Sequence, residues 1–303
     1  MAELKTEREF TDSSVTNRFP TVSIGMPVYN GEDYIREALD SLLEQSFSDF
    51  ELIISDNAST DSTSDICQEY VKKDERIRCI RQTHNAGALF NFQFVLNEAR
   101  GEYFMWAACD DKWDSSWIEK LLHMLEATGT GAAFGQVKPM NKYSQPILHV
   151  ATGRLFRFQG TRLMRRIRYF LEYEGAGKAN LFYSLFRKSV VKDCNLLDYE
   201  HDYHVIFDLL NKTEITSVKG VQLYKRIHAE SEAEVNNESR GYLLKLARRL
   251  VFPVEPQIQN GYFSRSVSFE RFLLILTSPL KYMFAYTYHI RYVINNVFSE
   301  NVR

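Results

Sequence analysis

Two adjacent carboxylates, Asp110 and Asp111, follow directly after an apolar run at residues 103–109, YFMWAAC. This run is apolar enough to form a strand buried on both faces of a sheet. Adjacent carboxylates at such a strand end repel each other and lose hydration, so they remain ionised only beside a positive charge. A divalent cation such as Mg²⁺ or Mn²⁺, held by carboxylates and substrate phosphates, is the simplest partner. The alternatives are that Asp110 caps a helix beginning near Ser115, or that Lys112 pairs with a neighbour.

The elements that position these carboxylates alternate between strand and helix. β-Rich runs lie at residues 21–28, 50–55, 76–80 and 102–109, and amphipathic helical segments lie between them at about 34–43, 62–73 and 88–99. This alternation through residue 126 predicts a parallel α/β sheet with right-handed crossovers. Ligands of such sheets gather at the carboxyl ends of the strands. Asp56 and the Asp110-Asp111 pair both fall at such ends.

Composition places the chain among ordinary globular proteins and predicts an uneven charge distribution. Hydrophobic residues make up 45% of the 303 residues and charged residues 25%, which permits a sizeable core. Residues 240–303 carry nine Lys/Arg against three Glu, about +6, so the rest of the chain is near −8. The four cysteines show no CxxC pair and are predicted to be reduced core thiols of a cytoplasmic protein. The polar residues 1–19 lack an apolar core and are interpreted as a flexible leader, not a signal peptide.

Two common nucleotide-binding motifs are missing. The sequence contains no GxxxxGK[ST] and no GxGxxG after its first strand, so a phosphate loop and a dinucleotide fold are unsupported. Nucleotide phosphates bound here would therefore need a metal. Nucleic acid is a poor candidate partner because the body of the chain is acidic and no recognised reading module is present.

Four segments in order resemble family 2 glycosyltransferases with the GT-A fold. They are PVYNGEDYIREALDSLLEQSFSDFELIISDNASTDST, THNAGALFNF with ARGEYFMWAACDDKW, EHDYHVIFDLL, and LYKRIHAES. The resemblance covers residues 20–231. It implies a Rossmann-like mixed sheet flanked by helices, comprising a GT-A domain at 20–235 with a nucleotide-binding half (20–126) and an acceptor half (127–235). A helical, basic extension follows at 236–303.

The resemblance implies a set of residues that bind the nucleotide sugar. The loop after the first strand would lie against the nucleotide base, and Asp56 would form a hydrogen bond with the base. The turn after residue 84 would approach the nucleotide through its backbone, where glycine permits close contact. Arg226 would steady the diphosphate. The predicted nucleotide-sugar residues are Pro27, Val28, Tyr29, Asn30, Glu32, Asp56, Asn85, Gly87, Asp110 and Arg226.

The resemblance also implies the metal ligands and the catalytic base. Asp110, Asp111 and His228 are the predicted ligands of Mn²⁺ or Mg²⁺. Asp202 matches the general base of inverting members, which takes the proton of the acceptor hydroxyl, and Glu200 is the alternative base. Without the resemblance, Asp202 is interpreted as a helix-start carboxylate.

Two basic segments suggest a membrane surface. Residues 153–170, GRLFRFQGTRLMRRIRYF, place six arginines among apolar residues, a pattern typical of a lipid-facing or a solvated helix face. Residues 272–290 are long enough to span a membrane but carry Pro279 and Lys281 near the centre, which favours a surface-lying or packed helix. A peripheral contact with an anionic membrane and a homodimer through the extension both remain open.

The sequence thus predicts an inverting transferase that moves a sugar from a nucleotide-diphosphate sugar, with UDP expected, to a glycan or lipid-linked acceptor. The place predicted for it is the cytoplasm or the inner face of the membrane. Two departures from the family pattern, Ala108 and His201, stand where acidic residues are usual. They suggest the alternative of a catalytically weak nucleotide-sugar-binding or scaffold relative. A nucleotidyltransferase is a third interpretation, but the glycine-rich, basic N-terminal loop that it needs is missing.

Overall fold

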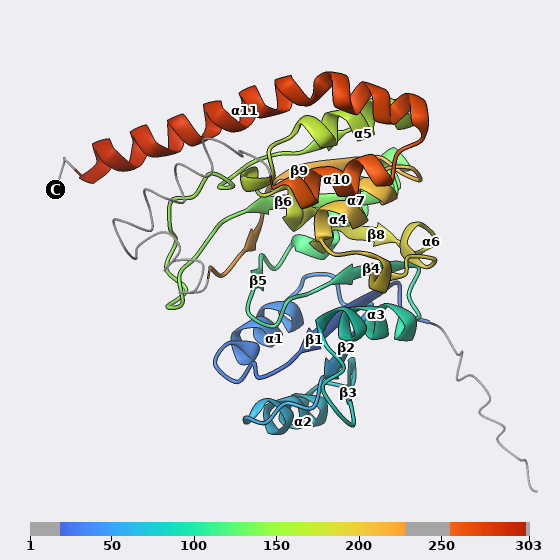
Figure 1. The fold of residues 1–303 in the computed structure, drawn as a ribbon. Helices are drawn as coiled ribbons and strands as arrows, with labels where there is room; N and C mark the ends of the chain where they lie inside the picture. Colours follow the sequence, from blue (N-terminus) through green and yellow to red (C-terminus); the bar gives the residue numbers. More distant parts are fainter. Residues whose placement is uncertain (1–18, 228–254, 301–303) are drawn as a thin grey trace, which may run out of the picture.

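The computed structural model describes residues 19–227 and 255–300 and has a mixed sheet as its centre (Figure 1). The strands run in the order β3-β2-β1-β4-β8-β6-β9-β5, with β7 paired to β9. Pairing is parallel among β1, β2, β3 and β4 and between β6 and β9, and antiparallel where β8, β5 and β7 join. The predicted leader lies almost wholly outside the described residues, and so does His228.

The first half of the chain forms the predicted alternation of strand and helix. Its elements are β1 (Val22–Val28), α1 (Ile35–Leu43), β2 (Phe50–Asp56), α2 (Thr63–Lys73), β3 (Ile77–Arg81), α3 (Ala88–Glu98) and β4 (Tyr103–Trp106). β1 is buried at all seven positions, as a central parallel strand covered on both faces must be. The parallel pairing brings the carboxyl ends of β1 and β2 together, where Val28 lies opposite Asp56.

The strand before the two carboxylates is shorter than predicted. It ends at Trp106, because its last pair with β1 is Gly25↔Trp106 and its antiparallel partner β8 reaches only Tyr103 and Phe104. One further hydrogen bond, from Ala107 N to Gly25 O at 2.9 Å, holds the chain before it leaves the sheet. Asp110 and Asp111 therefore lie in a loop beyond the strand, not at its last positions.

The second half completes the sheet and covers it. Its elements are β5 (Lys112–Trp113), α4 (Trp117–Thr128), β6 (Ala132–Val137), β7 (Arg157–Phe158), α5 (Arg162–Leu171), η1 (Glu174–Ala176), η2 (Lys178–Tyr183), β8 (Leu185–Arg187), α6 (Lys188–Val191), η3 (Leu196–Asp198), α7 (Asp202–Leu209) and β9 (Ile215–Tyr224). Aromatic side chains fill the interior, with Trp106 stacked on Phe182 at 4.3 Å between ring centres. α4 begins at Trp117 with Ser116 as its N-cap residue.

The described part of the C-terminal extension forms α10 (Pro256–Ser264) and α11 (Ser268–Glu300). In Figure 1, α11 runs along the side of the molecule that carries α5 and α10, remote from β2 and β3. Two buried ion pairs fasten it to the body: Arg166 Nε to Glu270 Oε1 at 2.6 Å, and Lys281 Nζ to Glu174 Oε1 at 2.6 Å. α11 continues through Pro279. Among the helices described, none is both long and apolar enough to cross a membrane.

Candidate active site

The loops after β1 and β2 are joined by reciprocal hydrogen bonds. Asn30 Oδ1 accepts from Thr60 N at 2.8 Å, and Glu32 Oε2 accepts from Ser62 N at 2.9 Å. Asp61 accepts in turn from the backbone of Glu32 and Thr63. Asn30 adopts a left-handed conformation (φ 49°), which asparagine tolerates better than most residues. The predicted nucleotide residues Asn30 and Glu32 thus shape one rigid rim at the end of the sheet.

The remaining predicted residues of this loop divide into buried and exposed groups. Pro27 and Val28 are the last residues of β1, and their side chains are buried. Tyr29 directly after them is 46% exposed. The surface that this segment offers to a ligand therefore comes from Tyr29 and Asn30, while Pro27 and Val28 support them from the sheet.

Asp56 is fully buried at the end of β2, so its carboxylate requires partners. Its Oδ1 accepts from Ser59 N at 2.9 Å, and its Oδ2 pairs with Arg81 Nη1 at 3.1 Å. Arg81, at the end of β3, keeps about half of its side chain exposed. The contact of Asp56 with a nucleotide base stays a prediction. The structure adds Arg81 as a neighbour that the sequence analysis did not identify.

The turn that carries Asn85 and Gly87 is exposed and is held by a buried asparagine. Asn57 donates through Nδ2 to Asn85 Oδ1 at 2.8 Å and accepts from Ala86 N at 3.1 Å. Gly87 has φ +90°, and a Cβ there would meet no atom within 4 Å. The backbone of this turn therefore faces open space beside the N-terminus of α3. Asn57 was missed by the sequence analysis, although its position next to Asp56 was a usable signal.

Asp110 and Asp111 have different surroundings. Asp111 is fully buried; its Oδ2 accepts from Lys225 Nζ and its Oδ1 from Arg226 N, both at 2.9 Å. Burial raises the pKa of Asp111 to about 6, although Lys225 opposes the shift. Asp110 is only partly buried. Both oxygens of Asp111 thus have protein partners, so a metal contact of Asp111 would have to replace one of them. The metal contacts of Asp110 and Asp111 both stay predictions.

Arg226 is an internal anchor of the site. Its side chain is 1% exposed and pairs with Glu37 of α1, while Nη1 donates to the backbone oxygens of Asn141 and Lys142 at 3.1 Å. Its Nε donates to the backbone oxygen of Asp110 at 2.8 Å. The predicted contact of Arg226 with a diphosphate therefore has no exposed guanidinium to make it. The geometry instead gives Arg226 the task of holding the Asp110 loop.

Glu37 links the helix after β1 to this loop, and the sequence analysis did not identify it. It pairs with Lys112 Nζ at 2.7 Å and accepts from Ser144 Oγ at 2.7 Å. Burial raises the pKa of Glu37, but the hydrogen bonds from Lys112, Ser144 and Arg226 outweigh it and lower the pKa below its ordinary value. Lys112 therefore pairs with a residue of α1, 75 positions away in the chain, and this pairing does not explain the adjacent carboxylates Asp110 and Asp111.

The predicted base Asp202 lies near the same centre. Asp202 is the first residue of α7, and both it and Glu200 are exposed. Desolvation by the surrounding protein raises the pKa of Asp202, although the nearby charges of Lys225 and His201 lower it. Lys225 also interacts electrostatically with Asp110, Asp111 and Tyr183. Lys225, which directly follows β9, thus interacts with residues of α7, η2 and the loop after β4. The sequence prediction chose Arg226 and His228 and did not include Lys225.

The described residues supply only part of the ligands that a divalent ion needs, so a bound substrate would have to supply the others. They contain no group of three or more His, Cys, Asp or Glu placed to hold a metal. The partly buried Asp110, with its backbone fixed by Arg226, provides one carboxylate. One carboxylate together with donor phosphates and water is an ordinary environment for Mg²⁺ or Mn²⁺. The predicted ligand His228 lies outside the described residues.

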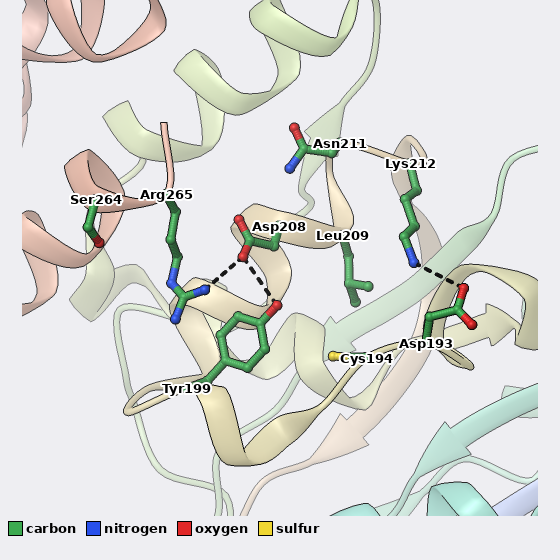
Figure 2. Close-up of a pocket in the computed structure, with 9 residues that line it drawn as sticks. All are labelled: Asp193, Cys194, Tyr199, Asp208, Leu209, Asn211, Lys212, Ser264 and Arg265. Atoms are coloured by element: carbon green, nitrogen blue, oxygen red, sulfur yellow. Dashed lines mark hydrogen bonds and ion pairs between the residues drawn. The ribbon is translucent and has the colours of Figure 1, made fainter. Parts of the chain in front are cut away.

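A separate polar cavity of about 560 Å³ lies on another part of the surface (Figure 2). It is lined by Asp193, Cys194, Tyr199, Asp208, Leu209, Asn211, Lys212, Ser264 and Arg265. Its charged residues are already paired, since Arg265 reaches Asp208 at 2.9 Å and Lys212 reaches Asp193 at 3.7 Å. No predicted site residue is among the residues that line it. The cavity lies at the junction of α7 and α10.

Comparisons with known proteins agree with this fold. The chain is 37% identical over 133 residues to TuaG of Bacillus subtilis, which is named as a putative teichuronic acid biosynthesis glycosyltransferase. The match spans 44% of this chain and 53% of TuaG. This chain therefore covers about half the length of that relative. The crystal structure of S. aureus TarS 1-349 with UDP has a TM-score of 0.57 at 16% identity, over 91% of this chain and 92% of that one. A mannosyltransferase from Pyrobaculum calidifontis, solved with GDP-Man and Mn²⁺, has a TM-score of 0.53 at 16% identity, over 89% of this chain and 70% of that one.

These likenesses confirm the predicted GT-A fold, a mixed sheet flanked by helices. The family model for glycosyl transferase family 2 matches residues 23–194, more than half of the chain. This match includes β1 to α6, with the loops of Asn30, Asp56, Gly87 and Asp110. The chain belongs to glycosyl transferase family 2.

Proposed function

We propose that this chain is an inverting glycosyltransferase that moves a sugar from a UDP-sugar to a hydroxyl of a glycan or lipid-linked acceptor. The observation that carries the proposal is the Asp110-Asp111 loop beyond the carboxyl end of β4, which Lys225 and Arg226 hold through hydrogen bonds of 2.8 and 2.9 Å. Family membership and the fold shared with UDP-bound TarS support a nucleotide-sugar donor.

Asp202 is the proposed base. Its carboxylate takes the proton from the acceptor hydroxyl as the hydroxyl oxygen bonds to the anomeric carbon, and the bond from that carbon to the diphosphate oxygen breaks with its electron pair on the nucleoside diphosphate. A pKa above that of an ordinary aspartate makes Asp202 the stronger base. Glu200, two positions earlier and exposed, is the alternative base.

Asp110 is the proposed ligand of the divalent ion, with Asp111 and Arg226 fixing its loop from behind. When bound, Mn²⁺ or Mg²⁺ supplies positive charge to the departing diphosphate. The rim formed by Tyr29, Asn30 and Glu32 and the backbone at Gly87 are the proposed surfaces for the nucleoside. Asp56 is proposed to reach the base from the end of β2.

The proposed place of action is the inner face of the cytoplasmic membrane, reached through α11 and α5. α11 exposes a stripe of large apolar side chains on the face opposite Glu270 and Lys281; its members are Phe269, Phe272, Ile275, Leu276, Leu280, Met283, Phe284 and Ile290. Exposed arginines of the neighbouring segment, Arg157, Arg162 and Arg168, give this side a positive charge. Such a surface suits anionic lipid, and a second copy of the chain is the alternative partner.

The test is release of nucleoside diphosphate from UDP-, GDP- and dTDP-sugars in the presence of membrane lipid extract, with Mn²⁺, Mg²⁺ or chelator. Wild type should turn over one donor. Asp202→Asn should lose about 10²-fold to 10⁴-fold in kcat, and Asp110→Asn should lose turnover while remaining folded. Asp193→Asn, an exposed carboxylate paired with Lys212, is the matched control and should behave as wild type.

The alternative function is a nucleotide-sugar-binding or scaffold relative without useful turnover. It is suggested by Ala108, a buried residue of the Asp110 loop, and by His201, the N-cap residue of α7. Binding of a nucleotide sugar by wild type without release of diphosphate from any donor would favour this alternative. Full turnover in folded Asp110→Asn would contradict the proposed metal position.

A further inference from the structure

Lys225 occupies a fixed position at the end of β9. Its backbone N–H donates to Lys138 O at 3.2 Å, and its ammonium donates to Asp111 Oδ2 at 2.9 Å. The same nitrogen lies 4.8 Å from the centre of the Tyr183 ring. An ammonium held by a buried carboxylate and an aromatic face has few other positions open to it.

This ammonium keeps donors for a ligand. A lysine has three N–H groups, and among the described residues Asp111 is the acceptor that lies within hydrogen-bond distance of Nζ. One quarter of the side chain is exposed. Arg226, the next residue, is 1% exposed, and its guanidinium donates to Glu37 and to backbone oxygens. Arg226 is therefore both more buried than Lys225 and more fully hydrogen-bonded within the protein.

Lys225 carries the positive charge at the centre of an acidic region, and an ammonium with an exposed part can bind a phosphate that arrives there together with a divalent ion. Asp111, its hydrogen-bond partner, directly follows the proposed metal ligand Asp110, and Arg226, the residue after Lys225, holds the backbone oxygen of Asp110. Lys225 therefore lies beside the loop to which the donor diphosphate is proposed to bind. Strong hydrogen bonds form when a charged N–H donor meets a phosphate oxygen. We propose that Lys225 binds the diphosphate of the nucleotide donor, with Asp111 holding its ammonium in position. This inference rests on the proposed function.

The test compares binding of UDP with binding of uridine to the same protein, by calorimetry, with Mn²⁺ and with chelator. Lys225→Gln should weaken binding of UDP by about tenfold or more and leave uridine unchanged, since only the diphosphate meets the ammonium. Lys225→Arg should retain much of the affinity. Lys138→Gln is the matched control, because Lys138 also lies over an aromatic ring, that of Tyr224 at 5.4 Å, and should bind UDP as wild type does.

A double variant separates diphosphate binding from a purely structural role as counter-ion of Asp111. Asp111→Asn with Lys225→Gln removes both charges, so no buried carboxylate is left unpaired. If UDP affinity stays low in the double variant, Lys225 contacts the diphosphate. If the affinity returns to that of wild type, or if Lys225→Gln alone binds UDP normally, the inference is overturned.

The binding data also distinguish failure of the Lys225 inference from failure of the proposed function. The ratio of UDP to uridine affinity is measured on one sample and does not depend on how much of a variant is folded, so an unchanged ratio also overturns the inference. Wild type that binds none of UDP, GDP and dTDP would overturn the proposed function itself. If the wild type binds GDP or dTDP instead of UDP, the variants are tested with that nucleotide and its nucleoside. Lys225→Gln should again weaken binding of the nucleoside diphosphate and leave binding of the nucleoside unchanged.

Discussion

The Nε atom of Arg226 donates a hydrogen bond of 2.8 Å to the backbone oxygen of Asp110, a residue 116 positions earlier in the chain. The terminal nitrogens of the same guanidinium reach Glu37 on α1 and Ser144. One buried cation therefore joins the helix after β1, the loop after β4 and the segment after β9. The position of the Asp110 carboxylate depends on this junction.

Arg226→Leu should destabilise the protein by about 3 kcal/mol, because the buried guanidinium is the donor to the backbone oxygens of Asp110, Asn141 and Lys142. Urea unfolding followed by circular dichroism measures the change. Arg36→Leu is the matched control; Arg36 pairs with Glu69 on the surface, and its loss should cost less than about 1 kcal/mol. Equal losses in the two variants would contradict the internal-anchor role of Arg226.

The acid limb of the pH profile should report Asp202. A base works only when deprotonated, so activity is present above its pKa and falls as pH decreases through it. Because desolvation raises the pKa of Asp202, this limb should lie above the ordinary aspartate value of about 3.9. The measurement is kcat/KM for the donor against pH, with folding monitored at each pH. A limb that stays unchanged in Asp202→Glu would assign it to another group.

Gly87→Ala should weaken nucleotide binding beyond its effect on stability. The backbone of Gly87, at φ 90° and ψ 163°, lies in a region almost restricted to glycine, so a side chain there costs about 1–3 kcal/mol. The added Cβ would enter the open space beside the turn. Gly129→Ala is a close control, because Gly129 has φ +68°, also faces open space, and ends α4 instead of lining the site. Gly129 has the left-handed helical conformation (φ 68°, ψ 7°), so Gly129→Ala should lose about 1–2 kcal/mol of stability and Gly87→Ala at least as much. If both bind the nucleoside diphosphate equally well, the turn does not contact the nucleotide.

Phe272→Glu with Leu276→Glu should reduce binding to anionic vesicles at least tenfold in flotation assays. Both side chains are more than half exposed on α11, and carboxylates there would oppose both apolar burial and the negative lipid charge. Leu148→Glu, at a residue 82% exposed elsewhere, should leave binding unchanged. Sedimentation of the wild type without lipid tests the alternative, since a dimer that the same two changes dissociate would assign the stripe to a protein interface.

The order of the first strands and helices could be predicted from the sequence because their signals are local. Apolar strands and amphipathic helices recur within short windows, and their alternation fixes a parallel sheet with its ligand end at Asp56 and the Asp110 loop. The recognisable segments placed the chain in its family for the same reason. Free cysteines at 67, 79, 109 and 194 agree with the absence of any CxxC pair.

The division of tasks within the site was decided by the tertiary structure. Adjacent residues of the same type cannot be told apart by a local sequence pattern. Nevertheless, Asp111 is fully buried and Asp110 is partly exposed. In the same way, the side chain of Arg226 is buried, while that of Lys225 is one quarter exposed. These differences arise from contacts between residues more than a hundred positions apart, which no local window contains. Burial and charge at such contacts give each carboxylate and each cation of the region its own surroundings. The chain alone therefore determined the fold, and packing across the sheet determined the surroundings of each candidate side chain.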